Sequence, residues 1–316
     1  MGEAGGIALN LELILLQFLV FPGLLFTGVA GLVTTWVDRK MTARVQMRQG
    51  PPLLQPFYDI GKLMIKETCV PREGSIALFL VAPLIGLAGV VLTSTILWRA
   101  LLDPQSTFVG DLIVLLYLLT LPAFATILGA SASHNPLASL GGSREMKLML
   151  AYELPFVLAV LVPVIQVESI RLGDILAAPA VAALPSGVIA FGVAVACMQA
   201  KLTLVPFDMP EAETELSGGA YIEYSGPPLA MFKLTRAMML FTLPVFLVVV
   251  FVGGAVVAGG WAGMLLGLLI WAVQVIVIVV LHNTEPRMRT DQAVRWFWGP
   301  VTGVALIAAA LAWIGW

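Results

Sequence analysis

The sequence has 316 residues, of which 59% are hydrophobic and only 11% are charged, and its formal net charge is −2. Soluble domains carry about a quarter charged residues, so this composition excludes an ordinary soluble domain and indicates a membrane protein embedded in the lipid bilayer. Nucleic-acid binding needs a basic surface, so no nucleic-acid partner is expected.

Eight segments are long and apolar enough to cross a membrane, which takes about 20 mainly apolar residues. The sixth and seventh divide an uncharged run that is too long for one crossing. In chain order the predicted spans are residues 13–37, 74–98, 112–133, 148–167, 175–200 (starting after Pro185), 229–252, 261–281 and 296–316. The sequence therefore predicts an all-α, polytopic membrane protein with about eight transmembrane helices, folded as a single membrane domain over residues 1–316.

Positive charge falls almost entirely on one side of these spans. Of the 17 Lys and Arg residues, all but Arg99 and Arg171 lie in the loops that follow the first, third, fifth and seventh spans, or, for Lys233 and Arg236, in the first turns of the sixth span next to such a loop. Cytoplasmic loops carry an excess of Lys and Arg. We therefore expect a multi-pass protein of the cell membrane, with the charged loops in the cytoplasm and both termini outside.

The first of these loops contains a predicted amphipathic helix after Pro56. Its apolar face holds Phe57, Ile60 and Met64, and its charged face holds Asp59, Lys62 and Lys66. Such a helix lies along the membrane surface or under a docked partner. Anchoring at the interface is the simpler of these two interpretations.

The loop after the fifth span is rich in acids, namely Asp208, Glu211, Glu213, Glu215 and Glu223. Asp208 and Glu211 have the spacing of a capping box, and a helix starting there would place Glu211 and Glu215 on one face. Carboxylates held close together raise one another's pKa, so such a cluster can hold and pass protons. A solvated acidic face is the alternative.

Glu153 lies about six residues inside the fourth span, where an acid costs about 2.5–3.5 kcal/mol on insertion scales. Intramembrane acids face a partner or a hydrated path. Arg144 and Lys147 precede Glu153 at the same end of the span and are its nearest cations in the sequence. A structural ion pair without a proton role is the alternative to a relay.

The chain shows no pattern for metal binding or covalent catalysis. Its two cysteines, Cys69 and Cys197, are far apart, and an iron–sulfur cluster or a structural zinc needs about four clustered ligands. We therefore expect no metal and no cofactor in this chain.

Several loop motifs together resemble one family, the H-type membrane subunit that forms the quinone chamber of respiratory NADH:quinone oxidoreductase, and its relatives in energy-converting (group 4) nickel–iron hydrogenases. The motifs are Arg44-Val-Gln-Met-Arg-Gln-Gly-Pro51, Leu54-Gln-Pro56, Tyr152-Glu153, Pro206-Phe-Asp-Met-Pro-Glu-Ala-Glu-Thr-Glu-Leu216, Glu223-Tyr-Ser-Gly226 and Pro286-Arg-Met-Arg-Thr-Asp-Gln292. The resemblance implies an eight-helix subunit between a cytoplasmic redox arm and an ion-translocating membrane arm.

The resemblance also implies roles for particular residues. The acidic path from the redox side into the membrane would contain Glu153, Asp208, Glu211, Glu213, Glu215 and Glu223. The surface that docks the redox subunits would contain Arg44, Arg48, Asp59, Lys62, Lys66, Glu67, Arg144, Glu145, Lys147, Arg287, Arg289 and Asp291.

Three details resemble the hydrogenase branch more than the quinone branch. Gly50-Pro51-Pro52 runs directly into Leu53-Leu54-Gln55-Pro56, without the longer insert that helps to shape the quinone entrance. Gly141-Gly-Ser-Arg-Glu145 and Asn283-Thr-Glu-Pro-Arg287 also resemble the ferredoxin-linked hydrogenases. The resemblance thus favours a coupling subunit whose partners are hydrogenase large and small subunits, iron–sulfur subunits and antiporter-like membrane subunits.

In such a complex, 4Fe-4S clusters and a NiFe site would lie in the partner subunits, and ferredoxin would supply the electrons for proton reduction. The same coupling role in a quinone oxidoreductase, a formate hydrogenlyase or a ferredoxin-dependent sulfur reductase is the near alternative. A stand-alone secondary transporter is the distant one.

Overall fold

The computed structural model describes residues 12, 15–211 and 213–316, and within these residues it is helical without β-strands. Seven helical segments in this part of the chain are long and apolar enough to span a membrane: Leu15–Val45, Ile76–Leu102, Asp111–Ala132, Pro136–Val167, Pro227–Ala258, Gly260–Thr284 and Thr290–Ile314. The shorter apolar helix α9 (Pro185–Lys201) packs against two of them and corresponds to the predicted fifth span. The prediction of an all-α polytopic membrane protein is confirmed.

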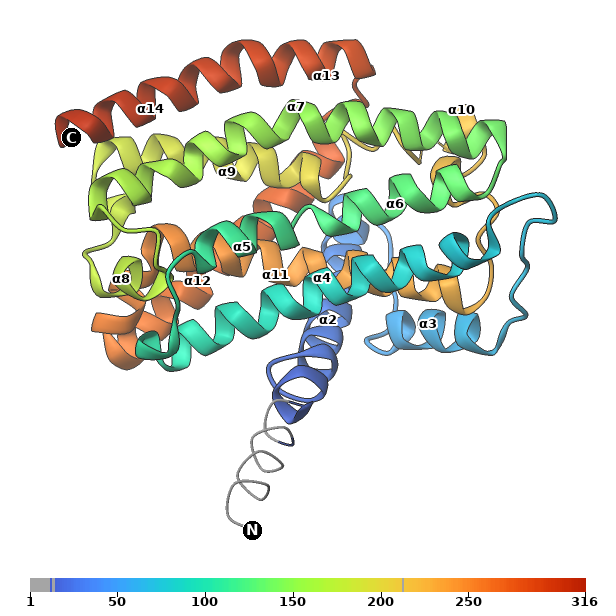
Figure 1. Cartoon of the computed structure of the whole chain (residues 1–316), viewed down its shortest axis with the longest axis horizontal. Helices are drawn as coiled ribbons and strands as arrows, with labels where there is room; N and C mark the ends of the chain where they lie inside the picture. Colours follow the sequence, from blue (N-terminus) through green and yellow to red (C-terminus); the bar gives the residue numbers. More distant parts are fainter. Residues whose placement is uncertain (1–11, 13–14, 212) are drawn as a thin grey trace.

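Helix α11 (Pro227–Ala258) forms the centre of the bundle. It packs against α2 (Leu24–Val45), α4 (Ile76–Leu102) and α12 (Gly260–Thr284). Its apolar window is 78% buried, whereas that of α12 is 28% buried. In Figure 1, α4 runs side by side with α6 (Leu121–Ala132), and α7 (Pro136–Val167) with α14 (Thr302–Ile314), while α2 crosses their direction.

The predicted third span is two helices, α5 (Asp111–Leu118) and α6, rather than one. Pro122 lies in the first turn of α6. A proline lacks the backbone N–H that an uninterrupted helix needs and clashes with the carbonyl four residues earlier. The break at residues 119–120 therefore follows from Pro122.

Helix α7 begins at Pro136, twelve residues before the predicted fourth span. The Asn135 side chain accepts a hydrogen bond from the Leu137 backbone N–H (2.9 Å) and caps the helix. A 32-residue helix is about 48 Å long, well beyond the roughly 30 Å hydrocarbon layer. Its first turns, which carry Arg144, Glu145 and Lys147, extend the helix beyond the predicted apolar span.

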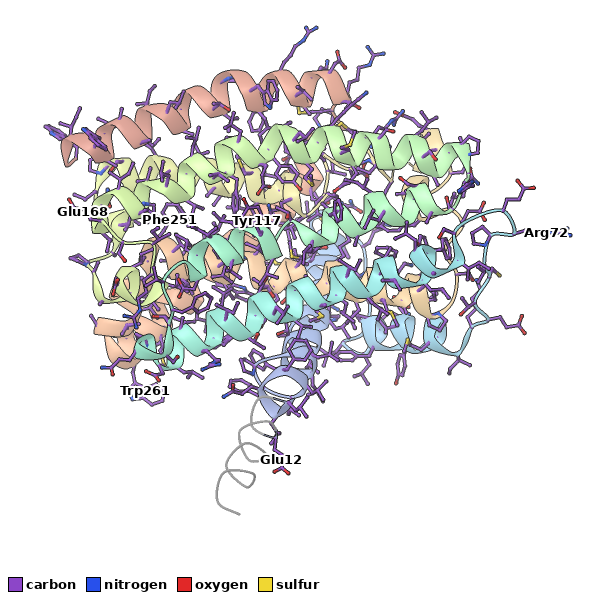
Figure 2. All side chains as sticks on the ribbon, in the orientation of Figure 1. Glu12, Arg72, Tyr117, Glu168, Phe251 and Trp261 are labelled. Carbon is purple, nitrogen blue, oxygen red and sulfur yellow. The ribbon has the colours of Figure 1, made fainter. Side chains whose placement is uncertain are left out.

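The remaining elements connect the long helices. They are α3 (Gln55–Ile65), η1 (Pro104–Ser106), α8 (Leu172–Ala177), η2 (Val181–Ala183), α10 (Glu213–Leu216), η3 (Gly219–Tyr221), α13 (Thr290–Trp296) and η4 (Phe297–Val301). In Figure 1, α3, α10 and α13 lie toward the same end of the bundle. Figure 2 places Arg72 at that end, and Glu168 and Trp261 at the opposite end. The basic loops are thus grouped at one end, and their location in the cytoplasm stays a prediction.

Helix α3 forms where the amphipathic pattern predicted it, although its inward face differs in one residue. Pro56 is buried and Ile60 and Leu63 are half-buried, whereas Met64 is exposed. The helix packs against α2 and α11. The contacts with these two helices select Leu63 rather than Met64 for the packed face.

Candidate functional site

A buried ion pair joins α9 to the middle of α7. Lys201 Nζ lies 2.8 Å from Glu153 Oε2 and also lies over the rings of Tyr152 (5.1 Å) and Phe156 (4.7 Å). The Lys201 side chain is 1% exposed and that of Glu153 is 24% exposed. A buried ammonium needs both a counter-ion and hydrogen bonds. The partner of Glu153 is therefore Lys201, and not Arg144 or Lys147, the nearest cations in the sequence.

Glu145 lies two turns before Glu153 on α7 and is only 2% exposed. The charged groups close enough to act on it electrostatically are Glu211, Arg236 and Lys201. Its Oε2 atom has no hydrogen-bond partner among the described residues. Because a buried side chain cannot contact a docked subunit, the prediction of Glu145 as a docking residue is corrected to a position inside the bundle.

A cavity of about 40 Å³ lies between Glu145, Lys201 and Arg236 and is also lined by Thr126 and Tyr221. One water molecule needs roughly 10–15 Å³ of such space and two to four polar partners. The cavity meets both conditions. It can therefore hold water between these charged groups.

Arg236 connects this cavity to the acidic loop. Its guanidinium forms an ion pair with Glu211 and also donates to the Thr203 carbonyl oxygen (3.0 Å). Glu211 and Arg236 both line a wider pocket of about 300 Å³, together with Tyr221 and Lys233. Burial, and then the Glu211 charge, raises the pKa of Tyr221, so its hydroxyl stays protonated beside the pair.

Asp208 continues the charged series toward the end of the bundle. Its Oδ2 accepts from Arg287 at 2.7 Å, whereas its buried Oδ1 has no partner in the described part of the chain. Burial raises the pKa of Asp208, although the hydrogen bond from Arg287 acts in the opposite direction. The nearby Glu211 charge also acts on it. Asp208 therefore takes up a proton more readily than an exposed aspartate.

The capping box predicted at Asp208 and Glu211 is wrong. Residues 205–211 form turns, and the short helix α10 starts only at Glu213. The two carboxylates bind Arg287 and Arg236 instead. An arginine partner satisfies a carboxylate more strongly than a backbone N–H does, because the hydrogen bond joins two charged groups.

The other predicted acids lie away from this series. Glu215 accepts from Arg144 (2.6 Å) at the surface, and this hydrogen bond lowers the pKa of Glu215. Glu223 accepts from the Asn135 side chain (2.6 Å) and holds its loop against the start of α7. The side chain of Glu213 lies outside the described residues, so its predicted role stays a prediction.

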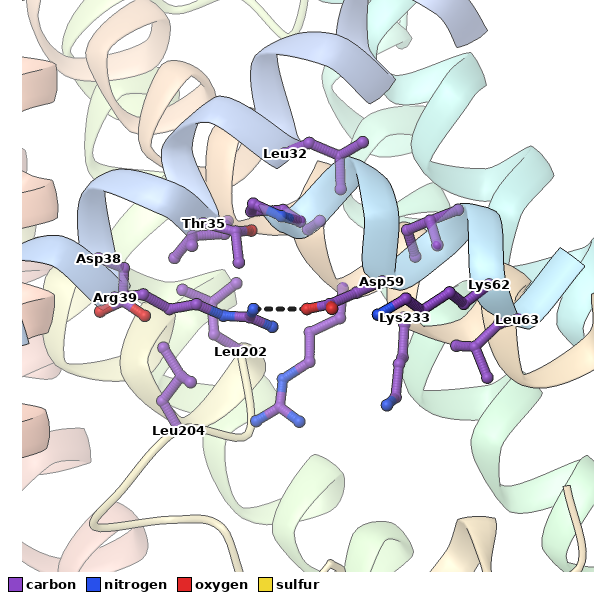
Figure 3. A pocket seen from close by; sticks show the side chains of 15 residues that line it. Leu32, Thr35, Asp38, Arg39, Asp59, Lys62, Leu63, Leu202, Leu204 and Lys233 are labelled. Atoms are coloured by element: carbon purple, nitrogen blue, oxygen red, sulfur yellow. Dashed lines mark hydrogen bonds and ion pairs between the residues drawn. The ribbon is translucent and has the colours of Figure 1, made fainter. Parts of the chain in front are cut away.

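A second pocket, of about 600 Å³, lies beside α3 (Figure 3). The Arg39–Asp59 ion pair (2.7 Å) extends across it, and Asp38, Lys62 and Lys233 contribute further charge. Burial raises the pKa of Asp59, but the hydrogen bonds from Arg39 and Gln55 outweigh it, so the pKa lies below its ordinary value. Arg236 also lines this pocket, which therefore meets the charged series at that residue.

Most of the predicted docking residues lie at the surface at the loop-rich end. Eight are exposed, namely Arg44, Arg48, Lys62, Lys66, Glu67, Lys147, Arg289 and Asp291, and Asp59, Arg144 and Arg287 are half-buried. This exposure leaves them accessible to another subunit. Their docking role stays a prediction.

The charged residues of the site that were missed from the sequence include Lys201, Arg236 and Asp38. Arg236 and Lys201 were counted only as loop charges. The rule that singled out Glu153, a charge inside an apolar span, would also have found Arg236, which lies ten residues inside α11. Asp38 lies beside His282 and Arg236. The sequence gives no comparable signal for it, because it directly follows the predicted first span, where charged loop residues are common.

Comparisons with known proteins agree with this architecture. A family described as NADH dehydrogenase matches residues 16–313. An H-type chain of the NADH-quinone oxidoreductase of Syntrophobacter fumaroxidans is 34% identical over 310 residues, covering 89% of this chain and 90% of the relative. The corresponding H-type chain of Syntrophotalea carbinolica is 33% identical over 333 residues and covers 98% of both chains.

A solved structure has the same fold. A chain of the membrane-bound sulfane sulfur reductase, an archaeal respiratory membrane complex, is similar with a TM-score of 0.81 and 25% identity, over 97% of this chain and 99% of that one. The family match and the relatives cover nearly the whole sequence. The chain therefore belongs to the NADH dehydrogenase family, as an H-type membrane subunit of a complex I-like oxidoreductase.

Proposed function

We propose that this chain is the coupling membrane subunit of an energy-converting nickel–iron hydrogenase, linking ferredoxin-driven proton reduction to proton or sodium translocation. The sequence motifs of the first, second and last charged loops support this branch. The structural similarity to a chain of a sulfane sulfur reductase complex is compatible with an electron acceptor other than a quinone.

The observation that carries the coupling role is the series of charged groups between the loop-rich end and the middle of α7. The series runs from Asp208–Arg287 to Glu211–Arg236, then to Glu145, and finally to Lys201–Glu153. Each step joins a different pair of elements. A charge change at one end can therefore act on the other end without a redox centre in this chain.

Glu145 is the central group of this series. When Glu145 is charged, it attracts Arg236 and Lys201 and repels Glu211. When it is protonated, these forces disappear, and in a low-dielectric interior they are strong. The route we propose for a proton between Glu211 and Glu145 runs through the pocket that Glu211 lines and the cavity that Glu145 lines, which share Tyr221 and Arg236.

Partner subunits supply the chemistry that this chain lacks. Hydrogenase large and small subunits and iron–sulfur subunits hold the NiFe site and the 4Fe-4S clusters, and antiporter-like subunits move the ion. The exposed basic residues of the first loop, such as Arg44 and Arg48, serve as their docking surface. When the redox centres of the partner subunits are reduced, a rearrangement of that interface alters the electrostatic environment of Asp208 and Glu211.

Quinone reduction is the second candidate, and the pocket beside α3 favours it. The pocket has about 600 Å³ and combines Leu32, Leu63 and Leu240 with the charged pair Arg39–Asp59. Apolar pockets of this size with a few placed polar groups suit small organic ligands. The relatives that are 33–34% identical are named NADH-quinone oxidoreductase subunits.

Purification of the whole complex through a tag on this chain separates the candidates. The co-purifying subunits are identified, and electron transfer from reduced ferredoxin is measured to protons, to sulfane sulfur and to a quinone. Hydrogen evolution by a complex with a nickel-bearing large subunit supports the proposal. Transfer to quinone or sulfur alone assigns the chain to the corresponding branch, and isolation of a functional transporter without partner subunits contradicts a coupling role.

A further inference from the structure

A groove with an excess of positive charge lies at the loop-rich end of the bundle, between α7, the acidic loop and the start of α13. It has a volume of about 750 Å³. Its charged lining consists of the cations Arg144, Lys147, Arg287, Arg289 and Arg295 and the acids Glu215 and Asp291. We call this set of residues the basic groove.

The acids of the chain balance only part of this charge. Arg144 pairs with Glu215, and Arg287 pairs with Asp208. Lys147, Arg289 and Arg295 are exposed and form no ion pair with any described residue. An excess of cations in a concave site attracts an anion.

An apolar, outward-facing surface begins directly beside the basic groove. On α7, Lys147 is followed one turn later by Leu150, which is 56% exposed, and then by Leu154. On the neighbouring helical segment Thr290–Ile314, Arg295 of α13 is followed three residues later by Trp298 of η4, which is 59% exposed. Residues three or four apart share a helix face, so both helices change from basic to apolar along the same side.

The change from basic to apolar residues occurs at the same depth along both helical segments. Trp298 Nε1 donates to the Leu150 carbonyl oxygen at 3.4 Å, and α7 lies beside α13 and α14 in Figure 1. Exposed tryptophan side chains mark the headgroup level of membrane proteins. The basic groove therefore lies where a phospholipid headgroup meets its acyl chains.

We propose that the basic groove binds the phosphate headgroup of an anionic phospholipid, whose acyl chains lie on the exposed surface of Leu150, Leu154 and Trp298. Arginine side chains bind phosphate oxygens in a two-pronged geometry, and basic pockets between transmembrane helices suit anionic headgroups. An acidic partner segment would use the cations but not the apolar surface beside them. The lipid accounts for both.

The bound lipid also has a structural consequence for the acidic loop. Met209 and Met288 line the basic groove, and the Met288 backbone N–H donates to the Pro206 carbonyl oxygen at 3.0 Å. A headgroup in the groove therefore contacts the segments that hold Asp208 and Glu215. This role is independent of which electron acceptor the complex uses.

The test measures binding of spin-labelled phosphatidylglycerol to the intact complex in phosphatidylcholine nanodiscs. The variant Lys147→Gln/Arg295→Gln removes two groove cations that form no ion pair with any described residue, and Lys66→Gln/Arg72→Gln removes two exposed cations at the same end but outside the groove. We expect the groove variant to bind the lipid about tenfold more weakly or worse, and the control to bind as the wild type does.

Equal binding by both variants overturns the proposal. Loss of the cytoplasmic subunits from the groove variant with lipid binding unchanged also overturns it, because the groove is then a protein-docking surface. Displacement of the lipid by an equal concentration of inorganic phosphate contradicts a site that requires the acyl chains.

A second measurement does not depend on the variants assembling. Phosphatidylglycerol with a photoreactive group near its phosphate is cross-linked to the wild-type complex, and the modified peptides are mapped. Cross-links within residues 144–154 and 287–298 support the proposal. Cross-links confined to other segments overturn it.

Discussion

Lys201 and Glu153 form an ion pair inside the bundle, with 2.8 Å between Nζ and Oε2, and the pair connects the last residue of α9 to the middle of α7. The lysine is almost fully buried, and it also lies over two aromatic rings. The pair is the inner end of the charged series described above. Its energetics therefore bear on stability and on the proposed coupling role.

Replacing Lys201 with methionine should destabilise the protein. The change leaves Glu153 without its cation, and removing one partner of a buried pair costs about 3–5 kcal/mol. Because Glu153 is 24% exposed, we expect the lower end of this range. Thermal unfolding in detergent measures the loss.

The double variant Lys201→Met/Glu153→Gln is the matched control for that prediction. It removes both charges, so it should recover much of the stability that Lys201→Met alone loses. If the two variants are equally unstable, the methionine itself disrupts packing, and the ion pair is not the cause.

Arg236 should resist conservative replacement. Its guanidinium binds the Glu211 carboxylate and the Thr203 carbonyl oxygen at once. A lysine keeps the charge but cannot reproduce this planar, forked geometry. We expect Arg236→Lys to lower coupled ion uptake, whereas Lys233→Arg, one turn earlier on α11, should leave it near the wild-type level. Wild-type uptake in Arg236→Lys would show that charge alone is sufficient there.

Asp208 and Glu215 should contribute to stability with opposite pH dependences. Burial raises the pKa of Asp208 above its ordinary value of 3.8, so protonation favours the folded state. This contribution is fully present below pH 3.8 and is lost as the pH rises through the folded-state pKa. The hydrogen bond from Arg144 lowers the pKa of Glu215 below 4.5, so its contribution is present above pH 4.5 and is lost as the pH falls through the folded-state value.

Thermal unfolding of Asp208→Asn and Glu215→Gln across this pH range measures both effects. The stability of the wild type relative to Asp208→Asn should fall as the pH rises. Relative to Glu215→Gln, it should fall as the pH drops. Parallel pH profiles for the two variants would contradict the assigned environments.

The Arg39–Asp59 pair should matter little for stability, in contrast to the Lys201–Glu153 pair. The side chains are 45% and 36% exposed to solvent, and exposed pairs contribute about 0.2–1 kcal/mol. We therefore expect Asp59→Asn to lower stability by about 1 kcal/mol or less. Chemical or thermal unfolding tests this, and a loss as large as that of Lys201→Met would mean that the pair is buried by a partner subunit.

The sequence predicted the helical fold well, because spans are recognised by length and hydropathy alone. It missed the break at Pro122 and the early start of α7, where local proline and capping chemistry decides the helix boundaries. Among the acids it singled out Glu153, Asp208 and Glu211, whose role in a proton path stays a prediction. It could not pair them, because Lys201, Arg236 and Arg287 approach from helices and loops distant in the sequence.

Glu145 shows the same limit more sharply. In the sequence it lies between Arg144 and Lys147, and the family resemblance placed all three in the docking surface. On the helix Glu145 points away from Arg144 and Lys147, which both line the basic groove, so Glu145 is buried while Arg144 is half-buried and Lys147 is exposed. Only the packing of α7 against its neighbours distinguishes them.

The number of ions moved per electron in sealed vesicles of the complex, compared between Glu145→Gln and the exposed control Glu285→Gln, tests the central claim most directly. A glutamine at position 145 keeps the size of the side chain but cannot exchange a proton. We predict that Glu145→Gln assembles and transfers electrons while its ion uptake is abolished, and that Glu285→Gln behaves as the wild type. Full ion uptake per electron in Glu145→Gln would contradict a relay through the buried carboxylate.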